Sequence, residues 1–373
     1  MASASALIVG RVRQFFRAEP APAIVAIGEL APVHTTLRRL WQAYRLRWKR
    51  RRLLVRAIAK RRQLTALCNR TAQIAPQAIL ATVTLRNERQ RLPHFLDHHR
   101  NIGVDHFLIV DNASTDGSRD YLLAQPDVSL WGTGDSYKLS RFGLDWLTWL
   151  QLRYAHGHWC LTLDVDELLV YPYWATRNLK ALTEWLDGGG VRSFGALMLD
   201  MYPKGPIGAQ PYVQGQNPVD LLGWFDGGNY SVQVQTRMRN LWIQGGARAR
   251  HFFAAEPHRA PTLNKVPLVK WNRRYVYVNS THAILPAALN RVFDELGGEK
   301  ASGILLHTKF LPEIIGKSRE EQGRRQHFAN SDLYQAYHAQ LTEGPDLWSE
   351  RSHFYTGWRQ LEAMGLMSRG GWL

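Results

Sequence analysis

Hydrophobic and polar positions alternate with changing period between residues 78 and 163, and each change marks a new predicted element. Residues 79–85 form a nearly continuous apolar run rich in β-branched side chains, typical of a parallel strand buried on both faces. Apolar residues at three- and four-residue spacing follow at 91–101 and predict a helix. The same criteria predict strands at 106–110, 128–131 and 159–163, a short helix ending at Leu123 and a helix at 140–155. This alternation predicts an α/β fold with a doubly wound, Rossmann-like, mostly parallel sheet flanked by helices.

Polar groups follow three of the predicted strands, at 84–88, 111–116 and 164–167. In a parallel sheet, ligands bind beyond the carboxyl ends of the strands. The sequence therefore predicts that these three groups converge on one cleft.

Beyond residue 190 the chain is rich in glycine, proline and aromatic residues. Strands are expected at 192–201, 232–239 and 275–278, separated by Pro/Gly turns. We expect this half to hold the acceptor side of the site. Helical patterns return from Pro312 to the C-terminal end.

The stretch 37–67 has another pattern, with aromatic and aliphatic residues at three-, four- and sevenfold spacing in a run dense in arginine and lysine. It predicts an amphipathic helix with a basic face. The apolar positions are Leu37, Trp41, Tyr44, Trp48, Val55 and Ile58.

Charge sets the N-terminal part apart from the rest. The net charge is +16, and residues 1–75 hold sixteen Lys and Arg against two Glu, which is +14. The basic amphipathic helix predicted at 37–67 suits an anionic bilayer surface, where its aromatic residues enter the interface and its basic residues attract lipid headgroups. A solvated helix that packs one stripe on the body is the alternative. Nucleic acid is not expected, because the chain carries no recognisable nucleic-acid-binding motif.

Composition narrows the class of protein further. The chain is 45% hydrophobic and 21% charged, which fits neither a disordered nor a membrane-embedded protein. It contains no long apolar run for a membrane span, and no secretory signal is expected. Two cysteines, Cys68 and Cys160, build no disulfide framework and indicate a reducing compartment. We therefore expect a cytoplasmic protein, peripheral on the inner face of the membrane.

Three parts are predicted along the chain. Residues 1–75 form the basic arm, 76–311 the catalytic domain, and 312–373 a C-terminal helical extension. The catalytic domain divides into a nucleotide-binding half, 76–167, and an acceptor half, 168–311.

Asp164 and Asp166 are the sharpest chemical signal. At spacing i, i+2 on an extended chain, both carboxylates point to one face at the end of a hydrophobic strand. Two such carboxylates suit Mn²⁺ or Mg²⁺, which completes its shell with water and phosphate oxygens. The ion would stabilise the charge on a departing nucleoside diphosphate. A pair of solvated turn acids is the alternative.

The strand ILATVTLRNE, the turn DNASTDGS and the segment LTLDVDE together resemble glycosyltransferase family 2. The resemblance is closer to a bacterial family-2-like branch in which an RNE element replaces the more usual start and motifs like HTKF and GWRQLEAMGLM stand near the end. It covers about residues 77–370. It implies a GT-A nucleotide-diphospho-sugar transferase fold, a divalent cation and inversion of the anomeric centre.

Carried over residue by residue, the resemblance implies specific roles. Residues lining the nucleotide pocket would be Thr84, Arg86, Asn87, Glu88, Asp111 and Asn112. Glu167 would lie near the donor sugar, and His307 would be a third metal ligand. The alternatives are a turn or helix-cap role for Asp111, a pair between Arg86 and Glu88, and a hydrogen-bonded core position for His307.

The catalytic base is harder to place, because the sequence has no clear acidic pair followed by a QxxRW element. An inverting transfer needs a carboxylate or histidine to deprotonate the acceptor hydroxyl. Asp226 and Glu256 are the candidates and Asp200 and His282 are weaker ones; each is also compatible with a structural role.

Basic residues in the second half suit a diphosphate or an anionic acceptor, although a solvated surface is also compatible with them. They are Arg248, Arg250, Lys265 and Lys270.

The sequence as a whole predicts a metal-dependent, inverting glycosyltransferase. It would move a sugar from a nucleoside-diphosphate donor to a saccharide or lipid-linked acceptor in surface polysaccharide or lipopolysaccharide synthesis. Two alternatives stay open. One is a catalytically silent sugar-nucleotide-binding or scaffold protein on a membrane surface, and the other is a phosphatase of the haloacid-dehalogenase type, although Leu168 departs from that pattern.

Overall fold

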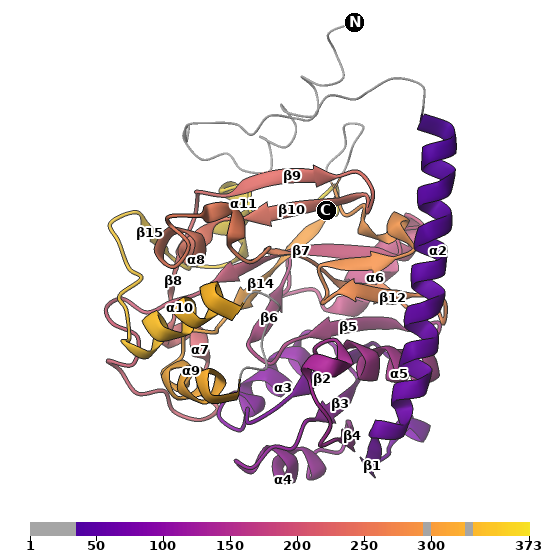
Figure 1. Ribbon diagram of the computed structural model, residues 1–373, viewed down its shortest axis with the longest axis horizontal. Helices are drawn as coiled ribbons and strands as arrows, with labels where there is room; N and C mark the ends of the chain where they lie inside the picture. The colour runs from indigo at the N-terminus through magenta and orange to yellow at the C-terminus, as the bar shows by residue number, and fades with distance from the viewer. Residues whose placement is uncertain (1–34, 294–299, 325–330) are drawn as a thin grey trace, which may run out of the picture.

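The computed structural model describes residues 35–293, 300–324 and 331–373 (Figure 1). Side chains are described for 40–293, 300–320 and 336–373. The first 34 residues of the predicted basic arm lie outside the described part.

A nine-stranded sheet forms the centre of the structure, in the order β1-β4-β3-β2-β5-β11-β7-β14-β6. Its strands are β1 (Thr65–Cys68), β2 (Leu80–Leu85), β3 (His106–Asp111), β4 (Val128–Gly132), β5 (Trp159–Leu163), β6 (Glu167–Val170), β7 (Ser193–Asp200), β11 (Asn264–Lys270) and β14 (Ser302–His307). Strands β2, β3, β4 and β5 pair in parallel, and β7 and β14 run in the same direction, whereas β1, β6 and β11 run against them. Six of the nine strands therefore place their carboxyl ends at one edge.

Successive residues of the central strands pack on opposite faces of this sheet. Ile79, Ala81 and Val83 pack with α3 (Leu92–Asn101) and α6 (Leu179–Gly188), while Leu80 packs with α5 (Leu144–Tyr154) on the other side. This is the alternation that pleated strands impose, and it explains the continuous apolar run in the sequence.

Smaller elements surround the sheet. Three two-stranded pairs are β9 (Ser231–Gln235) with β10 (Asn240–Gln244), β12 (Val276–Asn279) with β13 (Ala283–Leu285), and β8 (Trp224–Asp226) with β15 (Ser352–Phe354). The other described α-helices are α2 (Thr35–Lys60), α4 (Ser118–Leu123), α7 (Pro218–Leu221), α8 (Gly246–His251), α9 (Glu313–Arg324), α10 (Ser331–Thr342) and α11 (Trp358–Ala363). Within the described ranges, no helix is both long and apolar enough to cross a bilayer.

The predicted α/β class is confirmed: a large, mostly parallel sheet is flanked by helices. Some predicted elements differ in extent. The strand expected at 232–239 stops at Gln235, because the chain turns at 236–239 and returns as β10. Residues 65–68, assigned to the basic arm from sequence, form β1 and pair with β4 in the sheet.

Buried neutral histidines give the fold a predictable weakness in acid. Burial lowers the pKa of His98 to about 4, and its Nε2 lies 2.8 Å from the Leu169 carbonyl oxygen. Burial also lowers the pKa of His282 to about 3. Since the unfolded chain binds a proton near pH 6.5 and these folded side chains do not, stability falls as the pH drops below that value.

We expect His98→Gln, whose amide can keep the hydrogen bond to Leu169, to remove about 2 kcal/mol of the stability lost between pH 7 and pH 5. Urea unfolding at a series of pH values measures this effect. The control is His156→Gln at an exposed position, which should follow the wild-type pH profile. Equal profiles for the wild type and the His98 variant would contradict a neutral His98.

Candidate active site

The polar groups predicted to lie together do share one edge of the sheet. Leu85 of β2 stands beside Asp111 at the end of β3, and Val83 stands beside Leu163, the last residue before Asp164. His307 and Asp200, the last residues of β14 and β7, occupy the same edge because these strands run in the same direction. The sheet thus gathers residues that are far apart in the sequence.

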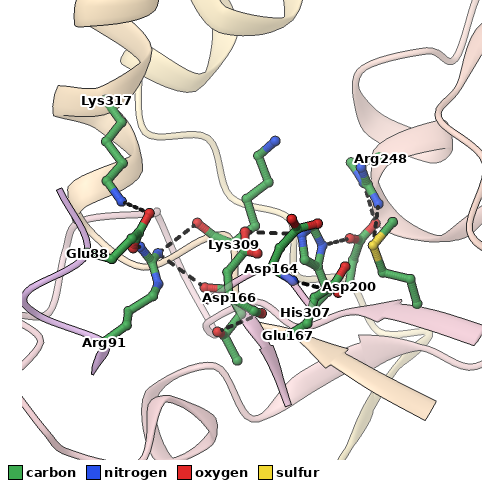
Figure 2. A network of polar contacts seen from close by, with 12 residues as sticks. Glu88, Arg91, Asp164, Asp166, Glu167, Asp200, Arg248, His307, Lys309 and Lys317 are labelled. Carbon is green, nitrogen blue, oxygen red and sulfur yellow. Dashed lines mark hydrogen bonds and ion pairs between the residues drawn. The ribbon is translucent and has the colours of Figure 1, made fainter. Parts of the chain in front are cut away.

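Three adjacent strands place Glu167, His307 and Asp200 side by side in register (Figure 2). The His307 ring bridges two carboxylates: Nδ1 lies 2.6 Å from Asp200 Oδ1, and Nε2 lies 3.3 Å from Asp166 Oδ2. Arg248 Nε donates to the other oxygen of Asp200 at 2.7 Å. A continuous polar chain therefore runs from Arg248 through Asp200 and His307 to Asp166.

Neighbouring charges determine which side chains of this polar chain are ionised. Burial opposes the ionised form of Asp200, but Arg248 and His307 lower its pKa to about 2. Burial likewise opposes ionisation of Asp166, and His307 and Arg91 hold its pKa well below the ordinary value. Burial alone would lower the pKa of His307, but its two carboxylate neighbours raise it.

The DxD segment departs from its predicted geometry. Asp164 and Asp166 stand in a turn between β5 and β6, closed by a hydrogen bond from the Glu167 N–H to the Asp164 carbonyl, rather than on an extended strand. Their carboxylates consequently have different partners. Asp164 accepts from Lys265 Nζ at 3.0 Å, while Asp166 faces His307. Thr308 donates through its N–H and hydroxyl to the Asp166 carbonyl oxygen and fixes the turn against β14.

Lys265 is almost fully buried between two acids. Its ammonium donates to Glu167, whose side chain is inaccessible, and to Asp164, which is half exposed. Burial lowers the pKa of Lys265, but the two carboxylates outweigh it and raise the pKa above the ordinary value. Burial raises the pKa of Glu167 to about 7, against the opposing field of Lys265.

The donor atoms at this edge fit a divalent cation that shares its shell with a ligand. Within the described residues, no group of three or more His, Cys, Asp or Glu is arranged to hold a metal by itself. Mg²⁺ and related ions, however, are commonly bound through one or two carboxylates plus substrate phosphates. A histidine that ligates a metal usually donates its other ring N–H to a carboxylate, as His307 is placed to do toward Asp200. Asp166 and His307 Nε2 are therefore a fitting protein pair.

The first predicted nucleotide-pocket residues carry unsatisfied polar atoms. The hydroxyl of Thr84 and Nε of Arg86 are buried and have no hydrogen-bond partner among the described residues. A Cβ added at Gly143, which has φ +77°, would lie 2.7 Å from the Thr84 hydroxyl, so only glycine fits beside this strand end. Buried polar atoms normally have partners, so these two atoms are exceptions among the described residues.

The second polar segment is locked to the first by reciprocal hydrogen bonds. The Asn87 N–H donates to Ser114, and Asn87 Oδ1 accepts from the Thr115 N–H. Asn112 donates its side-chain amide to two carbonyl oxygens and accepts from Arg86 through its own carbonyl. The two segments are thus one rigid unit.

Asp111 is fully buried and already engaged. Its Oδ2 accepts from Arg119 Nε and Nη2 at 2.9 and 2.7 Å, and its Oδ1 accepts from the Ser114 N–H. The turn role left open by the sequence is therefore real, and binding of a base or ribose by Asp111 stays a prediction.

Helix α9 lies against the RNE segment. Glu88 pairs with Arg91 at 3.0 Å and with Lys317 at 2.5 Å, and Arg86 lies 3.8 Å from Glu320. The direct pair between Arg86 and Glu88 considered from sequence is replaced by these contacts. The C-terminal helical extension therefore contributes to the predicted nucleotide side.

The two candidate bases stand in different settings. Asp226 is buried, accepts two hydrogen bonds from Arg250 at 2.9 and 3.0 Å and contacts the Tyr202 hydroxyl. Glu256 is exposed and pairs with Arg259 at 2.8 Å.

The remaining predicted residues are only partly brought together. Arg248 joins the polar chain through Asp200. Lys270 instead lies at the opposite end of the strands, beside Trp159 at the start of β5, and pairs with Asp187. Lys270 is thus remote from the strand ends that hold Asp166.

Three residues of this site were not identified from the sequence. Arg91 is buried beside Glu88, Arg119 holds Asp111, and Lys317 reaches Glu88 from α9. A buried-face position on the helix at 91–101 was the only available signal for Arg91, and nothing in the local sequence marked Lys317.

Comparison with known proteins gives weak similarities. No family model and no curated protein matches this chain. A solved structure of 4-diphosphocytidyl-2C-methyl-D-erythritol synthase is 17% identical with a TM-score of 0.23, covering 38% of this chain and 70% of its own. A glucose-1-phosphate thymidylyltransferase structure from Bacillus anthracis, solved with a sucrose, is 10% identical with a TM-score of 0.27, covering 78% of this chain and 96% of its own. Similarities this low carry no functional argument, and the family 2 resemblance stays a prediction.

Proposed function

We propose that this protein is a metal-dependent glycosyltransferase that uses a nucleoside-diphosphate sugar. The observation that carries the proposal is the position of His307 Nε2, 3.3 Å from Asp166 and backed by Asp200 on the opposite ring nitrogen. This is the ligand-and-support arrangement of a metal-binding histidine, at the edge of the sheet where ligands of α/β proteins bind.

Each part of the donor would meet a different part of this edge. The unsatisfied Thr84 hydroxyl and Arg86 Nε support binding of the nucleotide beside β2. Asp166 and His307 would hold Mn²⁺ or Mg²⁺, whereas half-exposed Asp164 is paired with Lys265. The cation would neutralise charge on the leaving diphosphate. The buried chain through Asp200 and Arg248 would keep the His307 ring in place during turnover.

The acceptor side completes the proposal. We propose inversion at the anomeric carbon and a saccharide or lipid-linked acceptor in surface polysaccharide or lipopolysaccharide synthesis. The support is the resemblance of the RNE, DNAS and DVDE segments to a branch with that chemistry. Asp226 or Glu256 would take the acceptor proton, and of the two Glu256 is more accessible to solvent.

A thermal-shift panel of UDP-, GDP-, CMP- and dTDP-sugars with and without Mn²⁺ tests the proposal. A ligand that binds the folded state raises its stability by mass action. We expect one nucleotide class to raise the melting temperature only when Mn²⁺ is present, and the same compound to be slowly hydrolysed. Stabilisation without hydrolysis or transfer would favour a silent binding protein, and no stabilisation by any compound would refute the proposal.

Asp200 offers a test of metal binding that needs no donor. Asp200→Asn keeps the size of the side chain but removes the charge that orients His307, so we expect Mn²⁺ affinity to fall by about 10- to 100-fold. Calorimetric titration with Mn²⁺ measures it. The control is Asp187→Asn, at the opposite edge beside Lys270, which should leave the affinity unchanged. Equal Mn²⁺ affinities in all three proteins would show that His307 is not a ligand.

A further inference from the structure

Helix α2 has a face that packs on the body. Along this face Leu53 and Ala57 are buried and Leu46 is half-buried. Leu46 and Leu53 pack in a cluster with Val276 and Leu285, and α2 also lies against α5. Arg56 anchors the helix through a 2.6 Å hydrogen bond to Asp145, a buried residue of α5. The body therefore occupies one side of α2.

A second stripe of large side chains lies on the opposite side of the same helix. Trp41, Tyr44, Trp48 and Val55 recur at spacings of three, four and seven residues and are 57, 56, 54 and 66% exposed. At 100° per residue these positions fall within about 60° of one another and roughly opposite Leu46 and Leu53. Four of the six apolar positions predicted from sequence therefore form an exposed stripe, while the side chain of Leu37 lies outside the described part and Ile58 is 36% exposed. A different stripe of α2 packs on the body.

The charge around the exposed stripe is entirely basic. Between residues 35 and 60 the chain has ten Lys and Arg and no Asp or Glu. Arg45 stacks over the Trp41 ring at 4.6 Å, and Arg51 lies 5.8 Å from the Trp48 ring. Figure 1 shows α2 standing along one flank of the body.

We infer that the exposed face of α2 docks on an anionic phospholipid bilayer. Tryptophan and tyrosine favour the boundary between headgroups and acyl chains, and nearby arginines are attracted to anionic lipid. A helix lying in the plane of the surface satisfies both at once, with the folded body above it. A nucleic-acid partner would use the charges but would leave the exposed aliphatic residue Val55 without an apolar environment.

Vesicle sedimentation with the full chain tests this inference. The wild type should bind mixed vesicles that contain phosphatidylcholine and phosphatidylglycerol in a one-to-one ratio. It should bind vesicles of pure phosphatidylcholine far more weakly. Trp41→Ser with Trp48→Ser should weaken binding to the anionic vesicles at least about tenfold, because it removes the residues that enter the interface. Arg45→Gln with Arg51→Gln and Arg52→Gln should weaken it by about a hundredfold at low salt.

The matched control replaces two other exposed apolar residues, Leu139→Ser with Val213→Ser, which are 66 and 64% exposed and lie outside α2. This variant should bind vesicles like the wild type. Binding that is unchanged by the tryptophan substitutions, or absent in the wild type, overturns the inference. Tight binding of a single-stranded RNA without vesicle binding would assign the face to nucleic acid instead. These readouts need no sugar nucleotide, so they stand apart from the test of the proposed activity.

Discussion

Replacing Asp166 with asparagine is expected to lower metal-dependent turnover of the sugar nucleotide by about a thousandfold, which corresponds to about 4 kcal/mol of lost transition-state stabilisation. The substitution keeps the shape of the side chain but removes the charge that faces His307 at 3.3 Å. An amide is a poor ligand for a cation that must also neutralise a leaving diphosphate. Release of nucleoside diphosphate, measured over a range of Mn²⁺ concentrations, gives the effect.

Two controls separate chemistry from folding in this experiment. Asp97→Asn, on the exposed side of α3 beside Arg100, changes an acid to an amide away from the site and should keep full activity. Because positive neighbours hold the pKa of Asp166 well below its ordinary value, its charge stabilises the fold and the urea midpoint of the variant should fall; circular dichroism at the assay temperature should nevertheless show a folded protein. An Asp166 variant that keeps its metal-dependent turnover within tenfold would rule out the proposed metal site.

Local patterns in the sequence were sufficient for the framework that positions this site. The run at 79–85 and the strand at 159–163 follow from their apolar side chains, because both strands lie in the centre of the parallel sheet and are buried on both faces. The helix at 91–101 follows from its periodicity, because only one face of it is buried. Rules for parallel sheets then placed 84–88, 111–116 and 164–167 at one edge. Those inferences needed no knowledge of long-range pairing.

The partners within the site could not be predicted in this way. Asp200 and His307 are separated by 107 residues and meet only because β7 and β14 pair in parallel with a specific register. Lys265 lies on β11, which runs against β5 and β7, and its sequence reads as a short basic segment. Nothing local to Lys265 shows that its ammonium is buried between two acids.

This burial changes the role expected for Lys265. From sequence it was a residue to hold a diphosphate, which requires an accessible ammonium. In the structure its donors are directed to Asp164 and Glu167, and only 3% of its side chain is exposed. Its first effect is therefore on folding, because it neutralises an acid that has no access to water.

We expect Lys265→Met to reduce the free energy of unfolding by about 3 kcal/mol or more, because removing one partner of a buried ion pair leaves the other uncompensated. Urea unfolding at neutral pH measures the loss. Lys270→Met is a matched control on the same strand: its pair with Asp187 is well exposed, and such pairs contribute about 0–1 kcal/mol.

The double variant Lys265→Met with Glu167→Gln decides whether the buried charge is the cause. A neutral amide needs no counter-ion, so the double variant should recover much of the stability lost in the single one, and the two substitutions should be strongly non-additive. Additive losses would place the effect in packing instead. A Lys265→Met protein that unfolds like the wild type but binds the sugar nucleotide poorly would contradict the stabilising role of Lys265 between the two acids. It would instead support the role in diphosphate binding that was expected from sequence.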